Sequence, residues 1–158
     1  MPIAMRHNET LELTRVDFYG RILPEHVNAY GSYGRANQAW IGFDCITFVS
    51  SDCDVSALST AYVSAFFDSF GELLQASRGH VRRRTGWVCD DVVCEQLLSL
   101  WLAKRNADSE PSDHVRLFST AEAASQWLQL SPEGAAALLS GEGFTEIARF
   151  DGAASASR

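Results

Sequence analysis

The feature that most constrains the fold of this chain is an almost unbroken apolar run in its first half. Residues 39–49 read AWIGFDCITFV, and Asp44 is the one charged residue among them. Aromatic and β-branched side chains dominate the run, which is typical of a strand buried on both faces of a sheet. Such a strand needs other elements packed on both sides of it. The run therefore predicts a layered domain with an internal, mainly parallel sheet.

Upstream of this run, the apolar residues follow a strand period that changes parity near Thr14. The residues concerned are Leu11, Leu13, Val16, Phe18 and Ile22. Because side chains alternate along a strand, the change predicts a bulge or a turn between two short strands. The sequence Leu23–Pro24–Glu25 then predicts the start of a short helix, since proline is tolerated in a first helical turn.

Downstream of the run, strand and helix patterns continue to alternate. An amphipathic stripe beginning at Val55 predicts a helix that ends at Gly79. Further strands are predicted at 81–89, 115–118 and, on a sheet edge, 144–150. The intervening helices are expected after Asp90–Asp91, after Ser119 or Thr120, and after Ser131, with ends at Lys104–Arg105 and at Gly141 and Gly143. Repeated strand–helix units predict an α/β fold with a sheet of four to six strands, mixed and mainly parallel, with packed helices.

Length and charge narrow the class of protein. The 158 residues suit one domain, predicted at 1–150, followed by a flexible tail at 151–158 (DGAASASR). Thirteen Lys and Arg against 20 Asp and Glu give a net charge of −7, whereas a free-standing nucleic-acid binder is more often basic. No apolar stretch reaches the roughly 20 residues that cross a bilayer. We therefore expect a protein that is not membrane-spanning and has no nucleic-acid partner.

The cysteines and the first residues indicate a reducing compartment. Residues 1–10 carry charged side chains and no apolar segment of a secretory signal, so a cytoplasmic location is expected. The four cysteines, Cys45, Cys53, Cys89 and Cys94, lack the two-residue gap of a zinc or thioredoxin-type site. We expect them to be reduced and mostly buried, and we expect neither a metal nor another cofactor.

The sequence contains few indications of a catalytic site. Asp44, Asp52, Asp54 and His26 are conceivable acid–base groups, and Asp90–Asp91 are conceivable metal ligands. No Ser-His-Asp signature, glycine-rich phosphate loop or His-x-x-x-His spacing accompanies them. The chain is therefore expected not to be an enzyme.

The second half of the chain resembles part of a known protein family. Residues 84–128 contain a strand (RTGWVCDD), a helix (VVCEQLLSLWLAKR), a polar loop, a short strand (HVRLF) and then STAEAASQWL. This arrangement resembles the C-terminal segment of SpoIIAA-like proteins, which are relatives of the STAS domain. The resemblance covers residues 16–130, with 118–128 its distinctive part. It implies a small α/β domain that regulates or binds rather than catalyses.

The resemblance also directs attention to the segment after the buried strand. Anti-anti-sigma factors of the wider family carry a phosphorylatable serine there, in an Asp-Ser-Ser/Thr-Gly motif. This chain has VSSDCD at 49–54, with neither the Asp-Ser order nor the glycine, so the phosphoswitch does not carry over. A candidate regulatory loop is left, with Ser50, Ser51, Asp52 and Ser56. The alternative is that Ser51, Asp52 or Asp54 merely caps the helix expected from Val55.

Two further surfaces are candidate binding sites. The basic cluster Arg78, Arg82, Arg83 and Arg84 could dock an anion or an acidic partner, or it could be a solvated strand entry. No aromatic residue interleaves these arginines, which argues against nucleic acid.

The aromatic residues Phe66, Phe67 and Phe70 exceed what one helix stripe needs. Since Phe66 and Phe67 are adjacent, they face different directions on a helix, and one of them could line an apolar pocket or a homodimer interface.

The prediction is a non-enzymatic, STAS-like regulatory or protein-interaction domain of bacterial signalling type, acting as a homodimer with an unknown protein partner. The alternative is a small-ligand or lipid-binding module with an apolar pocket.

Overall fold

The computed structural model describes residues 2–76, 84–89 and 115–151. Within these residues, six strands form one sheet in the order β5-β4-β3-β2-β1-β6. The strands are β1 (Ile3–Asn8), β2 (Leu13–Phe18), β3 (Asp44–Val49), β4 (Thr85–Val88), β5 (Val115–Phe118) and β6 (Thr145–Phe150). Strands β2 to β5 are parallel to one another, and β1 is antiparallel to both β2 and β6. The predicted α/β class with a mixed, mainly parallel sheet is confirmed.

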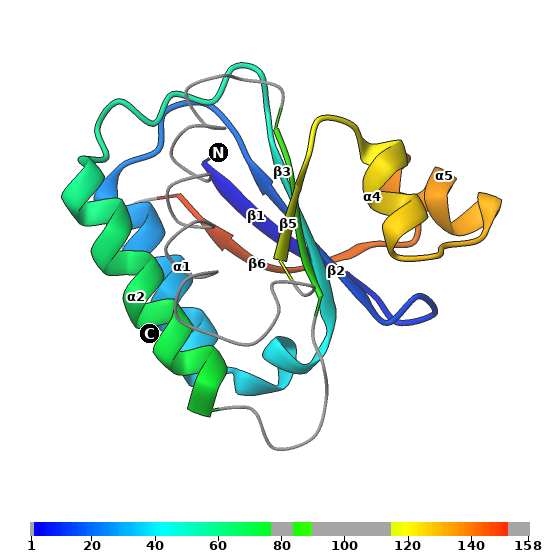
Figure 1. Cartoon of the computed structure of the whole chain (residues 1–158), viewed down its shortest axis with the longest axis horizontal. Helices are drawn as coiled ribbons and strands as arrows, with labels where there is room; N and C mark the ends of the chain where they lie inside the picture. Colours follow the sequence, from blue (N-terminus) through cyan, green and yellow to red (C-terminus); the bar gives the residue numbers. More distant parts are fainter. Residues whose placement is uncertain (1, 77–83, 90–114, 152–158) are drawn as a thin grey trace.

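Helices cover both faces of this sheet (Figure 1). Helices α1 (Pro24–Ala36) and α2 (Thr60–Ala76) pack on one face, and α4 (Ala121–Trp127) and α5 (Pro132–Ser140) pack on the other. The handedness of the crossovers explains this layering. From β2 to β4 the chain steps in one direction, so right-handed connections place α1 and α2 on the same face. The return from β5 to the far edge at β6 runs in the opposite direction, which places α4 and α5 on the other face.

The change of parity near Thr14 is neither a bulge nor a turn, and that prediction was wrong. β2 pairs with β1 and with β3 in unbroken register from Leu13 to Phe18. Leu13 packs against α4 and α5, whereas Val16 and Phe18 pack against the face of α1 and α2. Strand β2 carries apolar residues of both parities because both faces of the sheet are covered.

The central apolar run and the helix after it also differ from the predictions. Residues 44–49 alone form β3, because Gln38–Gly42 turn into a short 3-10 helix, η1. Helix α2 begins at Thr60 and not near Val55, and the preceding residues form a loop. The Ser59 hydroxyl accepts a hydrogen bond from the Tyr62 backbone N–H at 3.1 Å. Ser51, Asp52 and Asp54 therefore do not cap this helix.

Other predicted boundaries are confirmed. Pro24 occupies the first turn of α1, Thr120 caps α4 by accepting from the Ala123 N–H at 3.2 Å, and Ser131 caps α5. Gly141 ends α5 with φ of +77°, a left-handed conformation that favours glycine. The strands at 85–88 and 115–118 lie within the predicted ranges, and β6 is an edge strand. The predicted helix after Asp90–Asp91, its end at Lys104–Arg105, and Gly79 lie outside the described residues.

Strand β1 was not predicted, because its sequence carries Arg6, His7 and Asn8. The structure buries two of these polar residues. His7 is 7% exposed, lies against the rings of Trp40 and Phe43, and shares a hydrogen bond with the Thr14 hydroxyl at 3.2 Å. Asn8 is buried too, and its side-chain oxygen accepts from a backbone N–H in the hairpin turn. The hydrogen bonds and ring contacts offset the cost of burying polar groups.

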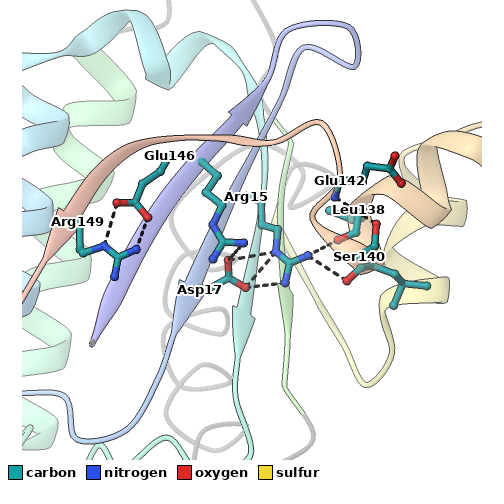
Figure 2. A network of polar contacts seen from close by, with 9 residues as sticks. Arg15, Asp17, Leu138, Ser140, Glu142, Glu146 and Arg149 are labelled. Carbon is teal, nitrogen blue, oxygen red and sulfur yellow. Dashed lines mark hydrogen bonds and ion pairs between the residues drawn. The ribbon is translucent and has the colours of Figure 1, made fainter.

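A β-bulge shapes the exposed edge strand β6. Met5 pairs with Ala148 and Arg6 pairs with Glu146, so Ile147 is an extra residue in β6. The bulge brings Glu146 and Arg149 onto one face of the strand, where the Arg149 Nε donates to Glu146 Oε1 at 2.9 Å (Figure 2). This hydrogen bond holds the pKa of Glu146 below its usual value. A bulge and a charged pair on an edge strand both discourage pairing with another chain.

Candidate functional site

An apolar pocket of about 80 Å³ lies between the sheet and the two helices α1 and α2. Its wall is entirely apolar. The lining side chains come from strand ends, from the loops that follow them and from both helices: Phe18, Val49 and Trp87; Ile22, Cys53, Val55 and Leu58; Val27, Tyr30, Tyr62, Val63, Phe66 and Phe67. The pocket is partly open, so its interior connects with the surface.

The position of the pocket follows from the direction of the strands. Phe18 and Val49 end β2 and β3, and Trp87 is the penultimate residue of β4. The pocket therefore lies at the carboxyl ends of three neighbouring parallel strands. In open α/β sheets, ligands bind in the crevice outside these carboxyl ends.

Backbone hydrogen bonds join the loops around the pocket. The Ser50 N–H donates to the Phe18 carbonyl at 3.0 Å, and the Asp54 N–H donates to the Gly20 carbonyl at 2.8 Å. In return, the Ile22 N–H donates to the Asp54 carbonyl at 2.9 Å. The loop after β3 is thus fixed to the loop after β2, which positions Ile22 and its neighbours on the pocket wall.

Tyr62 joins the two helices at the pocket wall. Its hydroxyl lies 3.0 Å from the Pro24 carbonyl and 2.7 Å from Asn28 Oδ1. A phenol has one proton and can donate to one acceptor at a time. Both contacts become hydrogen bonds if the Asn28 amide is turned so that its Nδ2 donates to the phenol oxygen. Burial raises the pKa of Tyr62, so this hydroxyl keeps its proton at neutral pH.

Close contact between α1 and α2 depends on a glycine. A Cβ on Gly31 would lie 3.0 Å from the Phe66 ring, tighter than ordinary van der Waals contact. Phe66 packs edge-on against Phe67, with ring centroids 5.6 Å apart, and Phe67 packs edge-on against Trp87 at 6.3 Å. The sequence predicted that one of these two phenylalanines could line an apolar pocket, and both of them line it. The side chain of Phe70 lies outside the described part of the structure.

The candidate regulatory loop forms part of the same site. Cys53 is buried and lines the pocket, while Ser51, Asp52 and Ser56 are exposed. A hydrogen bond from the Ser50 hydroxyl lowers the pKa of Asp52, with a further contribution from the Gly20 backbone. The loop thus reaches the pocket through Cys53 and Val55, whereas the predicted residues of the loop are not among those that line it.

Asp54 stabilises this loop and does not cap α2. Its Oδ1 accepts a hydrogen bond from the Ser56 backbone N–H at 2.9 Å, two residues along the chain. The hydroxyl and N–H of Ser56 lower the pKa of Asp54. Both loop carboxylates are therefore ionised at neutral pH.

The basic cluster is described at Arg84 alone, because Arg78, Arg82 and Arg83 lie outside the described residues. The Arg84 guanidinium forms an ion pair with Asp44 at 2.7 Å, and the backbone N–H of Arg84 also donates to the Asp44 carboxylate. Trp127 lies against Arg84 and Arg116, with guanidinium carbons 5.9 and 5.8 Å from its ring centre. Sequence reasoning missed this aromatic neighbour, which is 43 residues from Arg84. Arg84 anchors α4 to the start of β4.

The other candidate catalytic groups do not converge. His26 Nδ1 accepts the Leu23 backbone N–H at 3.0 Å, so this histidine caps the start of α1. Asp44 pairs with Arg84, and Asp52 and Asp54 lie on the exposed loop. The described residues contain no group of three or more potential metal ligands, and Asp90–Asp91 lie outside them.

The described cysteines match the prediction. Cys45, Cys53 and Cys89 are buried and form no disulfide, and Cys94 lies outside the described residues. Among the described helices, none has the length and apolar character to span a membrane.

No model of a protein family, no curated protein and no solved structure matches this chain. The resemblance to SpoIIAA-like proteins accordingly stays a prediction. The fold and the pocket define an α/β domain with a candidate small-molecule site at the carboxyl edge of its sheet.

Proposed function

We propose that this chain is a non-enzymatic binding domain whose pocket takes the apolar part of a small ligand. The observation that carries the proposal is the wholly apolar pocket at the carboxyl ends of β2, β3 and β4. Ligand sites in α/β proteins are concave, mostly apolar and placed at this edge. The alternative function predicted from the sequence, a small-ligand module, is therefore the one that the geometry supports best.

The volume limits the ligand. A cavity of about 150 Å³ with a similar lining takes benzene. This pocket has about half that volume, which suits a short aliphatic chain better than a ring. Burying one methylene group contributes about 0.8 kcal/mol, so four of them contribute about 3 kcal/mol. The apolar part alone therefore gives a dissociation constant weaker than about 1 mM.

A direct test is an NMR titration of the labelled protein with 1-pentanol. We expect saturable shifts confined to the pocket residues. In the variant Val63→Phe, the added ring fills the pocket, and the shifts should be lost. The matched control is Ala65→Phe, which adds the same ring at an exposed position of α2. Absence of binding to the native protein, or equal binding to the Val63→Phe variant, would refute the proposal.

A second candidate function is the STAS-like regulatory role, in which the domain contacts a protein partner. What favours it is the exposed loop with Ser51, Asp52 and Ser56 beside the pocket, where a bound ligand could alter the surface offered to a partner. Affinity capture with the native chain and with a Ser51→Ala/Asp52→Asn/Ser56→Ala variant tests this role. A partner that both chains retain equally would exclude the loop as the contact. Light scattering after size exclusion tests the proposed homodimer.

A further inference from the structure

Helices α1 and α2 lie side by side on one face of the sheet and are joined at two levels (Figure 1). At the start of α1, the Tyr62 hydroxyl lies 3.0 Å from the Pro24 carbonyl. Near the end of α1, the Arg35 guanidinium donates to the Ser69 hydroxyl. The two contacts follow the same order along both helices, so α1 and α2 run parallel and are held together on either side of the middle of α1.

Gly31 lies between these two contacts and is buried against α2. A Cβ at this position would lie 3.0 Å from Phe66 Cε2, whereas the Arg35 guanidinium, at 3.6 Å, is at an ordinary contact distance. The closest obstacle to a methyl group at Gly31 is therefore the Phe66 ring. Separation of the helices would stretch the contacts of Tyr62 and Arg35, so a shift of the ring is the easier response.

The space into which the Phe66 ring can move is the apolar pocket. Phe66 lines this pocket, and the ring of Phe67 lies beside it with the centroids 5.6 Å apart. Protein interiors are close-packed, so a displaced side chain moves most readily into an existing void. Because the pocket measures only about 80 Å³, even a small shift of a whole ring removes an appreciable part of its volume.

We infer that Gly31 determines how long an alkyl chain the pocket accepts, although Gly31 is not itself among the lining residues. It is a positioning residue that acts through Phe66. The inference rests on the proposed binding function and adds the residue that limits the size of the ligand. Alanine is more favourable than glycine inside a helix. A methyl group at Gly31 should therefore favour the helix and narrow the pocket, so that binding weakens without a loss of stability.

The test measures dissociation constants for 1-butanol and 1-pentanol by NMR titration. Burial of one methylene group corresponds to about a fourfold gain in affinity, so the native protein should bind 1-pentanol about fourfold more tightly than 1-butanol. In Gly31→Ala we expect the affinity for 1-pentanol to fall about fourfold or more, and the two alcohols to bind alike. The midpoint of urea denaturation should be no lower than that of the native protein.

The matched control is Gly34→Ala, which makes the same change in the same helix. No atom of the described residues lies within 4 Å of a Cβ at Gly34, so this variant should keep the native affinity for both alcohols. A second check uses Phe66→Leu, which removes the ring that Gly31 faces. In that background, Gly31→Ala should change the affinity for 1-pentanol by less than about twofold, because the two positions act through one contact.

Three results would overturn the inference while 1-pentanol still binds the native protein, and they leave the binding proposal standing. The first is a native preference for 1-pentanol in Gly31→Ala. The second is an equal loss of affinity in the two glycine variants, which would assign the effect to the helix as a whole. The third is a lower urea midpoint in Gly31→Ala, which would show that the ring does not move into the pocket. If the native protein binds neither alcohol, the inference and the binding proposal both fail.

Discussion

Arg15 holds the buried carboxylate of Asp17 from two residues away on the same face of β2 (Figure 2). Arg15 Nη2 lies 2.8 Å and Nε 3.0 Å from Asp17 Oδ1, and Asp17 is 2% exposed. The guanidinium also lies over the Phe48 ring at 4.4 Å and donates to the Leu138 carbonyl at the end of α5. The Arg15 side chain thus forms an ion pair with the buried Asp17 carboxylate on the sheet and also anchors the end of α5.

Replacing Arg15 should lower the free energy of unfolding. The substitution Arg15→Met leaves Asp17 charged and buried, with Arg6 as its remaining cationic neighbour at 4.0 Å. Leaving one partner of a buried pair unpaired costs about 3–5 kcal/mol. We expect a loss of about 3 kcal/mol in the free energy of unfolding, measured by urea denaturation, because Arg6 compensates in part. The double variant Arg15→Met/Asp17→Leu should recover most of the loss, and a double variant no more stable than Arg15→Met would contradict this account.

The stability of the protein should fall as the pH decreases through the range in which His7 titrates. Burial lowers the pKa of His7, and Glu9 and Glu12 offset part of that effect. In the unfolded chain the pKa of histidine is about 6.5. As the pH decreases below that value, the unfolded state binds a proton before the folded state does. The free energy of unfolding therefore decreases until the pH reaches the lower pKa that His7 has in the folded state. The contribution of one such group is no steeper than about 1.4 kcal/mol per pH unit.

Replacing the imidazole isolates this effect from the other histidines. His7→Phe keeps a ring between Trp40 and Phe43 and removes the titrating group. Urea denaturation between pH 7.5 and 5.5 should give the variant a flatter dependence of stability on pH. Identical slopes for the two proteins would show that His7 is not the source.

Gly86 should not tolerate a methyl group. A Cβ at this position of β4 would lie 2.6 Å from Ile46 Cδ1 and 3.3 Å from the Phe118 ring. Ile46 is fully buried, so its terminal methyl group has little room to move. We expect Gly86→Ala to lose about 1–3 kcal/mol in thermal or urea unfolding. Since valine lacks the Cδ1 atom, Gly86→Ala/Ile46→Val should lose less than the sum of the two single changes, and simple additivity would argue against this clash.

The phenol of Tyr62 should stabilise the junction of α1 and α2. Tyr62→Phe removes the contacts with the Pro24 carbonyl and Asn28. The expected loss is about 0.5–1.5 kcal/mol in the free energy of unfolding. Tyr33→Phe is the matched control, because the described residues supply no hydrogen-bond partner for the Tyr33 hydroxyl. Equal losses in the two variants would assign the effect to the removed atom itself and not to the helix junction.

The predictions that succeeded were those in which local chemistry and tertiary packing agree. Proline at the start of α1, Thr120 and Ser131 at helix caps, and Gly141 in a left-handed conformation each act within one helical turn. The start of α2 was misplaced because Val55 and Leu58 follow a helical spacing. They belong to the pocket wall, and a loop can bury apolar residues as well as a helix can.

By itself the sequence determined the class of fold and the mainly parallel sheet with its edge strand β6. These follow from hydrophobic period and from backbone geometry, which act over a few residues. Tertiary structure alone decided that the 50–56 loop and the phenylalanines share one pocket, that β1 buries His7, and that a bulge at Ile147 aligns Glu146 with Arg149. Those outcomes depend on which distant strands and helices become neighbours, because the sheet order and the crossover hand bring together residues that no local period connects.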